Sequence, residues 1–174
     1  MTTIAIIGAG PLGRWLALAA ARAGFRVFLE DVMPSNLHHA QEYLRQQLTP
    51  GPDAVSFVST IEDAVREADL VIDCVPDELE SKLEILWLLD RMAPPKTVIA
   101  TPTTNLSIVD LAACTYRPEK CVAIATDARD LSEPRPGSAI LVRTTPRTAS
   151  GAVALVRSFW DRLGFDSNFE QTGD

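Results

Sequence analysis

A run of three glycines near the N-terminus constrains the fold of this chain more than any other feature. Residues 8–13 read Gly-Ala-Gly-Pro-Leu-Gly and have the spacing G-x-G-x-x-G. They follow a short β-branched apolar run, residues 3–7, and open a segment with the properties of a helix, residues 11–23. In a strand–turn–helix unit, such glycines allow a tight turn and bring a pyrophosphate close to the backbone. The segment therefore predicts a dinucleotide-binding turn, with phosphates at the positive end of the helix.

The second predicted strand spans residues 25–30 and ends in an acidic pair, Glu30 and Asp31. This pair indicates which dinucleotide binds. Asp31 lies 18 residues after Gly13 (31 − 13). This is close to the spacing of about 20 for the carboxylate that binds the adenosine ribose hydroxyls. A carboxylate there repels a 2′-phosphate, so we expect NAD(H) rather than NADP(H). Arg14 and Arg22 are nearby cations that would instead favour NADP(H). The alternative interpretation of the three glycines is a tight turn with a purely structural role.

Strand-like apolar runs alternate with helix-like segments along the rest of the chain. Further strands are expected at residues 55–58, 70–75, 97–100, 121–125, 139–142 and 166–170. Helices are expected at residues 34–48, 60–68, 78–92, 107–113 and 148–163, with a turn at 49–52 and a loop at 126–138. The alternation predicts an α/β fold of the Rossmann-like kind, with a doubly wound, mainly parallel sheet covered on both faces. The loop at 126–138 is a candidate lid or a remodelled part of an active site.

Composition excludes several classes of protein. The 174 residues are 47% hydrophobic and 22% charged, which is ordinary for one globular domain. The net charge of −7 argues against a nucleic-acid-binding surface. Three cysteines without a C-x-x-C pair indicate reduced thiols, and we expect no metal site. No apolar run approaches the roughly 18–20 residues that span a bilayer, so we expect a cytoplasmic protein without membrane contact.

Several further segments carry a resemblance to a known family. Residues 22–31, 68–82, 89–95 and 100–108 read RAGFRVFLED, ADLVIDCVPDELESK, LDRMAPP and ATPTTNLSI. Together with the glycine loop they resemble the L-3-hydroxyacyl-CoA dehydrogenase family, from residue 1 to about 122 and loosely over 148–170. The resemblance covers the family's NAD-binding domain and implies an oxidoreductase of fatty acid metabolism. We therefore expect residues 1–174 to form a single NAD-binding domain, without the family's helical C-terminal domain for substrate binding and dimerisation.

The resemblance also implies the roles of particular residues. Asp77 and Lys82 fall where the family contacts the nicotinamide half of the cofactor. The serine that meets the substrate oxygen falls on Thr104, whereas the asparagine of the same loop is replaced by Pro102. Alternatives are an exposed helix lysine for Lys82 and a capping hydroxyl for Thr104. The remaining residues expected at the cofactor are Gly8, Gly10, Pro11, Leu12, Gly13, Asp31, Val75 and Pro76.

The catalytic position departs from the family pattern. The resemblance places Ala125 where the family has its catalytic histidine, and the partner glutamate would lie near Arg143. Alanine cannot take the hydroxyl proton, a task that suits imidazole because its pKa lies near neutrality. One possibility is an NAD-dependent dehydrogenase with a rebuilt site, in which Thr104 and Asp127 act on a hydroxyacyl-CoA or a small hydroxy or keto acid. The alternative is a catalytically silent NAD-binding module that senses the cofactor or acts with a partner chain.

Two expectations concern the surface. Without the family's second domain, an apolar patch would stay uncovered, and patches of that kind usually find a partner. We therefore expect a homodimer, formed through the helix at 148–163 with Phe159 and Trp160. His38 and His39 are the only histidines and are expected to be solvated.

Overall fold

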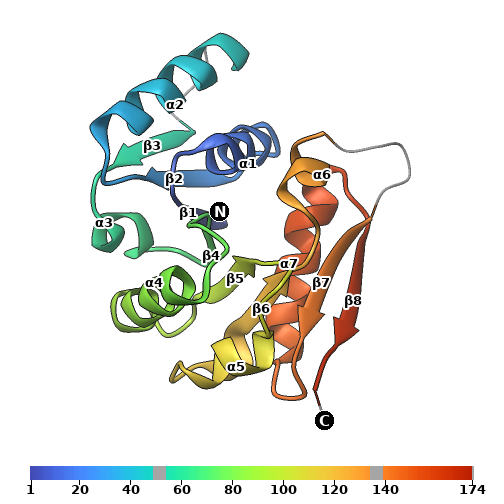
Figure 1. Ribbon diagram of the computed structural model, residues 1–174. Coiled ribbons are helices and arrows are strands. Elements are labelled where there is room, and N and C mark those ends of the chain that lie inside the picture. The colour runs from blue at the N-terminus through green and yellow to red at the C-terminus, as the bar shows by residue number, and fades with distance from the viewer. Residues whose placement is uncertain (49–53, 134–138, 174) are drawn as a thin grey trace.

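The strands form one continuous sheet in the computed structural model, which describes residues 1–48, 54–133 and 139–173 (Figure 1). In this part of the chain the strands are β1 Thr3–Ile7, β2 Arg26–Glu30, β3 Val55–Val58, β4 Leu70–Asp73, β5 Val98–Pro102, β6 Cys121–Ile124, β7 Ile140–Thr144 and β8 Ser167–Gln171. Their order in the sheet is β3-β2-β1-β4-β5-β6-β7-β8. Neighbouring strands are parallel except for β6 and β7, which run antiparallel. The mainly parallel α/β sheet is thus confirmed. The predicted turn at 49–52 and residues 134–138 of the predicted loop lie outside the described residues.

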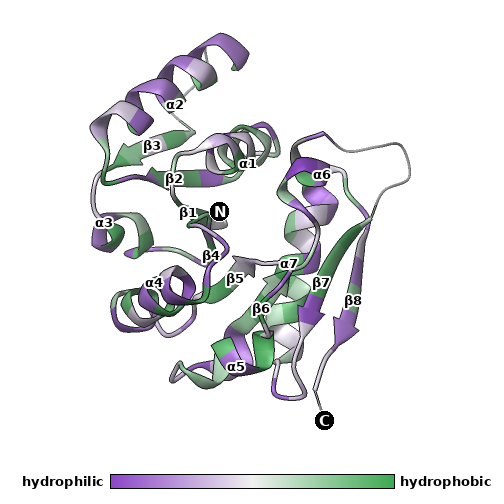
Figure 2. Cartoon of the chain, in the orientation of Figure 1, coloured by the Kyte–Doolittle hydropathy of each residue, from purple (hydrophilic) through white to green (hydrophobic). Residues whose placement is uncertain are grey.

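Helices cover both faces of this sheet. They are α1 Pro11–Arg22, α2 Pro34–Gln47, α3 Ile61–Val65, α4 Leu79–Met92, α5 Ile108–Ala113, α6 Ala128–Ser132 and α7 Ser150–Leu163, with a 3₁₀ turn η1 Pro118–Lys120. Alternate residues of each strand face opposite sides. Ile4 and Ile6 pack with α1 and α7, whereas Ala5 and Ile7 pack with α3, α4 and α5. Apolar colour runs along β3, β5, β6 and most of β7, whereas the helices carry apolar and polar bands in alternation (Figure 2).

The reversal of strand order locates the edge at which ligands bind. The chain moves outward from β1 to β2 and β3, then returns to pair β4 on the other side of β1. The carboxyl ends of β1 and β4 therefore diverge into helices on opposite faces. A crevice forms at such a switch point and is the usual ligand site of an open α/β sheet.

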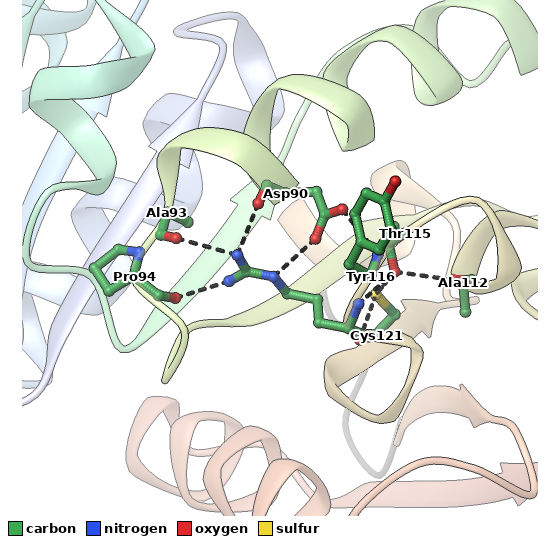
Figure 3. A network of polar contacts seen from close by, with 8 residues as sticks. Asp90, Ala93, Pro94, Ala112, Thr115, Tyr116 and Cys121 are labelled. Atoms are coloured by element: carbon green, nitrogen blue, oxygen red, sulfur yellow. Dashed lines mark hydrogen bonds and ion pairs between the residues drawn. The ribbon is translucent and has the colours of Figure 1, made fainter.

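The C-terminal end of α4 is held by hydrogen bonds from one arginine, Arg117 (Figure 3). The Arg117 guanidinium donates hydrogen bonds to the backbone carbonyls of Asp90, Ala93 and Pro94 at 2.9, 3.1 and 2.7 Å. Its Nε also donates to the Asp90 carboxylate at 3.0 Å. Two of these carbonyls, those of Asp90 and Ala93, lie at the end of α4, where the helix itself supplies no partner. The Pro94 carbonyl also accepts the backbone N–H of Thr97 at 3.0 Å. The hydrogen bonds of Arg117 connect the end of α4 with the segment that leads into β6.

Two expectations about the C-terminal third are wrong. Part of the predicted loop at 126–138 forms the short helix α6, because the Asp127 carboxylate accepts the backbone N–H of Arg129 and caps it. Leu131 of α6 is fully buried in the core beside α1. Phe159 and Trp160 are 1% and 0% exposed and pack on Phe25 and Phe165, so they cannot form a dimer contact. The homodimer itself stays a prediction.

Thr60 caps α3 by accepting the backbone N–H of Asp63 at 3.2 Å. The expectation of solvated histidines is confirmed. His38 and His39 are exposed on α2. The three cysteines are free thiols. No helix in the described ranges is long and apolar enough to cross a membrane.

Candidate dinucleotide-binding site

The glycine loop connects β1 with α1 in a geometry that side chains would block. Gly8 has a φ of +100°, and a Cβ on it would lie 3.1 Å from the carbonyl oxygen of Cys74. A Cβ on Gly13 would lie 1.8 Å from the Gly8 carbonyl oxygen. A Cβ on Gly10, in contrast, would meet nothing within 4 Å. Gly8 and Gly13 thus shape the loop, and Gly10 leaves open space beside it.

The N-terminus of α1 opens onto this space. The helix begins at Pro11, and no side chain caps its first turn. Its unpaired N–H groups, with about half a positive charge, are therefore available to an anion. Pro11 lacks an N–H, but at the first helical position that group has no helical partner. A diphosphate fits this cradle, and a Cβ at residue 10 would intrude on it.

Asp31 holds the glycine loop from the end of β2. Its Oδ2 accepts the backbone N–H of Ala9 at 2.9 Å and the side-chain amide of Asn36 at 3.1 Å. Its Oδ1 accepts the backbone N–H of Met33 at 2.8 Å. Asp31 as a whole residue is 8% exposed. A carboxylate can accept about four hydrogen bonds, which leaves capacity for a ribose hydroxyl.

A cavity of about 500 Å³ lies beside Asp31, at the carboxyl ends of β1, β2 and β4. Of the residues that the sequence predicts at the cofactor, it brings together Gly8, Gly10, Asp31, Val75 and Pro76. Its apolar side also includes Ile61 of α3 with Ile85 and Leu88 of α4. The cavity is therefore a mainly apolar slot next to an anion site, which suits a base attached to a sugar diphosphate.

Glu30 lines the same cavity and was missed by sequence reasoning. It is 3% exposed, and its Oε1 has no hydrogen-bond partner among the described residues. Burial, with a smaller contribution from the charge of Asp31, raises the pKa of Glu30 to about 7. The available signal was a carboxylate that directly follows the apolar residues Val27, Phe28 and Leu29 of a strand.

Lys82 does not lie at the surface of the site. It is completely buried, and its Nζ lies 2.6 Å from Oδ1 of Asp73, which is also completely buried. Burial raises the pKa of Asp73, and the Lys82 ammonium opposes this shift. The alternative of an exposed helix lysine is therefore wrong. Sequence reasoning missed Asp73, although a carboxylate at the end of an apolar strand was a signal for such a pair.

Two loops of the predicted nicotinamide half are tied together. Oδ2 of Asp77, after β4, accepts the backbone N–H of Thr104, after β5, at 3.0 Å. The backbone N–H of Thr103 donates to Ile124 of β6 at 3.0 Å, and Pro102 ends β5. The Thr104 side chain is exposed. The structure thus brings Asp77, Pro102 and Thr104 to one edge of the sheet.

Residue 125, where the resemblance implies a catalytic base, is an alanine, whose side chain cannot accept a proton. Ala125 follows β6 directly, and its N–H donates to the carbonyl of Leu141 at 2.8 Å. Asp127 is exposed and caps α6. Arg143 pairs in register with Ala123, and its Nε lies 3.6 Å from Glu170 on β8. Among the described residues, those near Ala125 thus include the carboxylate of Asp127 but neither an imidazole nor a glutamate in the place of the expected partner.

The glycine loop at the start of α1, the carboxylate at the end of β2 and the slot at the switch point define a dinucleotide-binding domain of the Rossmann type. A family model described as 3-hydroxyacyl-CoA dehydrogenase, NAD binding domain, matches residues 3–125. The chain belongs to this family, and NAD is accordingly the cofactor for which the domain is built.

Curated relatives and solved structures agree with this placement. The chain is 32% identical over 135 residues to a probable 3-hydroxybutyryl-CoA dehydrogenase of Bacillus subtilis, covering 70% of this chain and 47% of that protein. It is 37% identical over 131 residues to an L-carnitine dehydrogenase of Burkholderia mallei, covering 69% and 40%. The crystal structure of 5-formyl-3-hydroxy-2-methylpyridine 4-carboxylic acid 5-dehydrogenase, an NAD⁺-dependent dismutase, superposes with a TM-score of 0.82 at 28% identity, covering 98% and 58%. The chain thus spans about half the length of the curated relatives it matches.

Proposed function

We propose that this chain is the NAD(H)-binding part of an oxidoreductase that acts on a hydroxyacyl-CoA or a small hydroxy acid, with a catalytic site that departs from the family pattern. The observation that carries the cofactor part is the open cradle at Gly10 beside the carboxylate of Asp31. When bound, NAD⁺ supplies a hydride acceptor. The chain's own residues would hold the diphosphate at α1, the adenosine half along β2 and the nicotinamide half near Asp77.

The substrate end supports only part of a dehydrogenase site. Thr104 presents an exposed hydroxyl on a loop that Asp77 fixes, so it can donate a hydrogen bond to a substrate oxygen. Asp127 is the nearest carboxylate along the chain from Ala125, and it is exposed to solvent. Thr104 and Asp127 together are the rebuilt site of this proposal.

A second candidate function is a catalytically silent NAD-binding module that senses the cofactor or acts with a partner chain. The specific observation in its favour is Ala125, a residue without a proton-accepting side chain at the position where the resemblance implies an imidazole. Asp127 also has a structural use as the cap of α6, which accounts for its presence without catalysis. The two candidates differ in whether this chain turns over substrate.

The cofactor part is tested by calorimetric titration with NAD⁺ and NADP⁺. We expect NAD⁺ to bind more tightly, because the Asp31 carboxylate accepts from the ribose hydroxyls and repels a 2′-phosphate. Asp31→Ala should weaken NAD⁺ binding by about 1.5–3 kcal/mol, the range for a hydrogen bond to a charged group. Arg22→Gln, on the outer end of α1, is the control and should leave the preference intact. Equal affinity for both dinucleotides in the parent protein would contradict the proposal.

A further inference from the structure

Glu30 has a buried carboxyl oxygen that no group among the described residues satisfies. Its Oε1 is buried without a partner, whereas the neighbouring Asp31 accepts three hydrogen bonds from the protein. A buried polar atom without a partner costs free energy, of the order of 1–3 kcal/mol. Such an atom in a ligand cavity is explained when the ligand completes its hydrogen bonding. Glu30 is therefore a candidate ligand contact.

The position of Glu30 defines which part of the cofactor it can reach. It precedes Asp31 on β2 and faces α3 and α4, in the cavity beneath Ile61, Ile85 and Leu88. With the diphosphate at α1 and the ribose at Asp31, the next group along the dinucleotide is the adenine. The apolar side chains of the cavity match the faces of a flat ring, and Glu30 lies at its edge.

The charges around Glu30 favour its protonated form. Asp31 lies beside it, directly after β2, and Glu84 of α4 lines the same cavity. On β4, Asp73 is paired with Lys82, so that ammonium is not available to Glu30. The other cavity neighbours, from β1, α2 and α3, are the uncharged residues Ile7, Asn36 and Ile61. No cation among the described residues that line the cavity faces Glu30, and burial raises its pKa to about 7.

We propose that Glu30 is an adenine-recognition residue, which in its neutral form donates its O–H to a ring nitrogen and accepts the 6-amino N–H. A carboxylic acid carries the donor and the acceptor side by side, as adenine carries the complementary pair. An ionised Glu30 cannot donate, and it adds a negative charge near the diphosphate. The assignment rests on the proposed binding of NAD and goes beyond it by naming the group that reads the base.

The test is calorimetric titration of NAD⁺ between pH 6 and pH 8. If only the neutral form binds and the pKa is about 7, the apparent affinity falls roughly tenfold across this range. Glu30→Gln places an amide donor and a carbonyl acceptor at the same positions, so it should bind NAD⁺ with an affinity that does not change with pH. Glu30→Ala should bind more weakly than wild type at pH 6, also without pH dependence.

Two controls separate Glu30 from other titrating groups. Glu84→Gln removes a carboxylate from the same cavity and should retain the tenfold change. The double variant His38→Gln, His39→Gln removes the exposed imidazoles of α2 and should retain it as well. A pH dependence that persists in Glu30→Gln, or that is missing in the wild type, overturns the proposal.

A second ligand tests the contact with the base. Nicotinamide purine dinucleotide lacks the 6-amino group and adds no bulk, so wild type at pH 6 should bind it roughly two- to tenfold more weakly than NAD⁺. Glu30→Ala should bind both ligands equally. Equal binding by the wild type overturns the adenine assignment alone. Absence of NAD⁺ binding at every pH overturns the proposed function and this assignment with it.

Discussion

Gly10 and Gly13 belong to the same glycine motif but have different surroundings in the structure. At Gly13 a methyl group would lie 1.8 Å from the Gly8 carbonyl oxygen, which is a backbone atom that cannot rotate away. At Gly10 a methyl group would point into open space. One glycine is therefore required by the fold itself and the other by the ligand.

Alanine substitutions should separate these two requirements. Gly13→Ala should destabilise the protein by several kcal/mol, because overpacking at a helix–strand contact moves the backbone. Gly10→Ala should leave the midpoint of thermal unfolding without ligand nearly unchanged and weaken NAD⁺ binding at least tenfold. Calorimetric scans and NAD⁺ titrations of both variants measure this. A Gly10→Ala variant that binds NAD⁺ as tightly as wild type would show that the diphosphate lies elsewhere.

Glu30 should also make stability depend on pH. Its pKa is about 7 in the folded protein and near the ordinary value of 4.5 when unfolded, so the folded state binds the proton more tightly. The stability from this group is fully present below about pH 4.5 and is lost as pH rises through about 7. Glu30→Gln should thus be more stable than wild type at pH 8, by about 3 kcal/mol for a pKa difference of 2.5 (7 − 4.5), and similar to it at pH 4.5.

Thermal unfolding without ligand at pH 4.5 and pH 8 measures this difference. Glu84→Gln is the matched control, because Glu84 is exposed and its removal should change stability little at either pH. A Glu30→Gln variant that gains nothing at pH 8 would mean that the wild-type carboxylate is solvated or paired in solution.

At the scale of elements, the buried pair Asp73–Lys82 connects β4 with α4 beneath the cofactor edge. The helix places Lys82 on its inner side, where the aliphatic stem lies in the core and the ammonium reaches the end of the strand. Removal of one partner from a buried pair leaves an uncompensated charge. The pair therefore fixes the start of α4, from which the Asp77 loop leads back to β4.

Lys82→Met should destabilise the protein by about 3–5 kcal/mol at pH 8, since it leaves Asp73 buried without its partner. Urea denaturation measures the change. Lys96→Met is the matched control: Lys96 also contacts a carboxylate at 2.6 Å, that of Asp69, but its side chain is 57% exposed. Its removal should cost less than about 1 kcal/mol. Equal losses in the two variants would refute the distinction between a buried and an exposed pair.

At the scale of the whole molecule, whether this chain turns over substrate depends on residue 125. A positioned general base contributes about 10²–10⁴-fold in rate. We expect the chain to oxidise 3-hydroxybutyryl-CoA very slowly, and Ala125→His to raise the rate of NADH formation by restoring an imidazole after β6. Thr104→Ala is a control that should lower any residual rate. Turnover by the wild type at the roughly 1–10³ s⁻¹ of ordinary enzymes would contradict the silent-module alternative.

Much of the fold was accessible from local sequence patterns. The strand–glycine–helix unit, the helix that begins near residue 60 and the acidic residue after β2 depend on residues close together along the chain. The apolar period of each strand reflects its burial on two faces. Backbone hydrogen bonding and side-chain periodicity act over a few residues, so the sequence alone determined the elements, their alternation and the cofactor cradle.

Contacts between distant residues were decided only by the tertiary structure. The order of the strands places Thr104 against Asp77, and the packing of α4 on the sheet buries Lys82 against Asp73. The same packing leaves Oε1 of Glu30 unpaired in the cavity. A charged residue reads alike in the sequence whether it is solvated, paired or isolated. Its state depends on the groups that the sheet brings within a few ångströms of it, because burial and Coulomb interactions depend on distance in space rather than on distance along the chain.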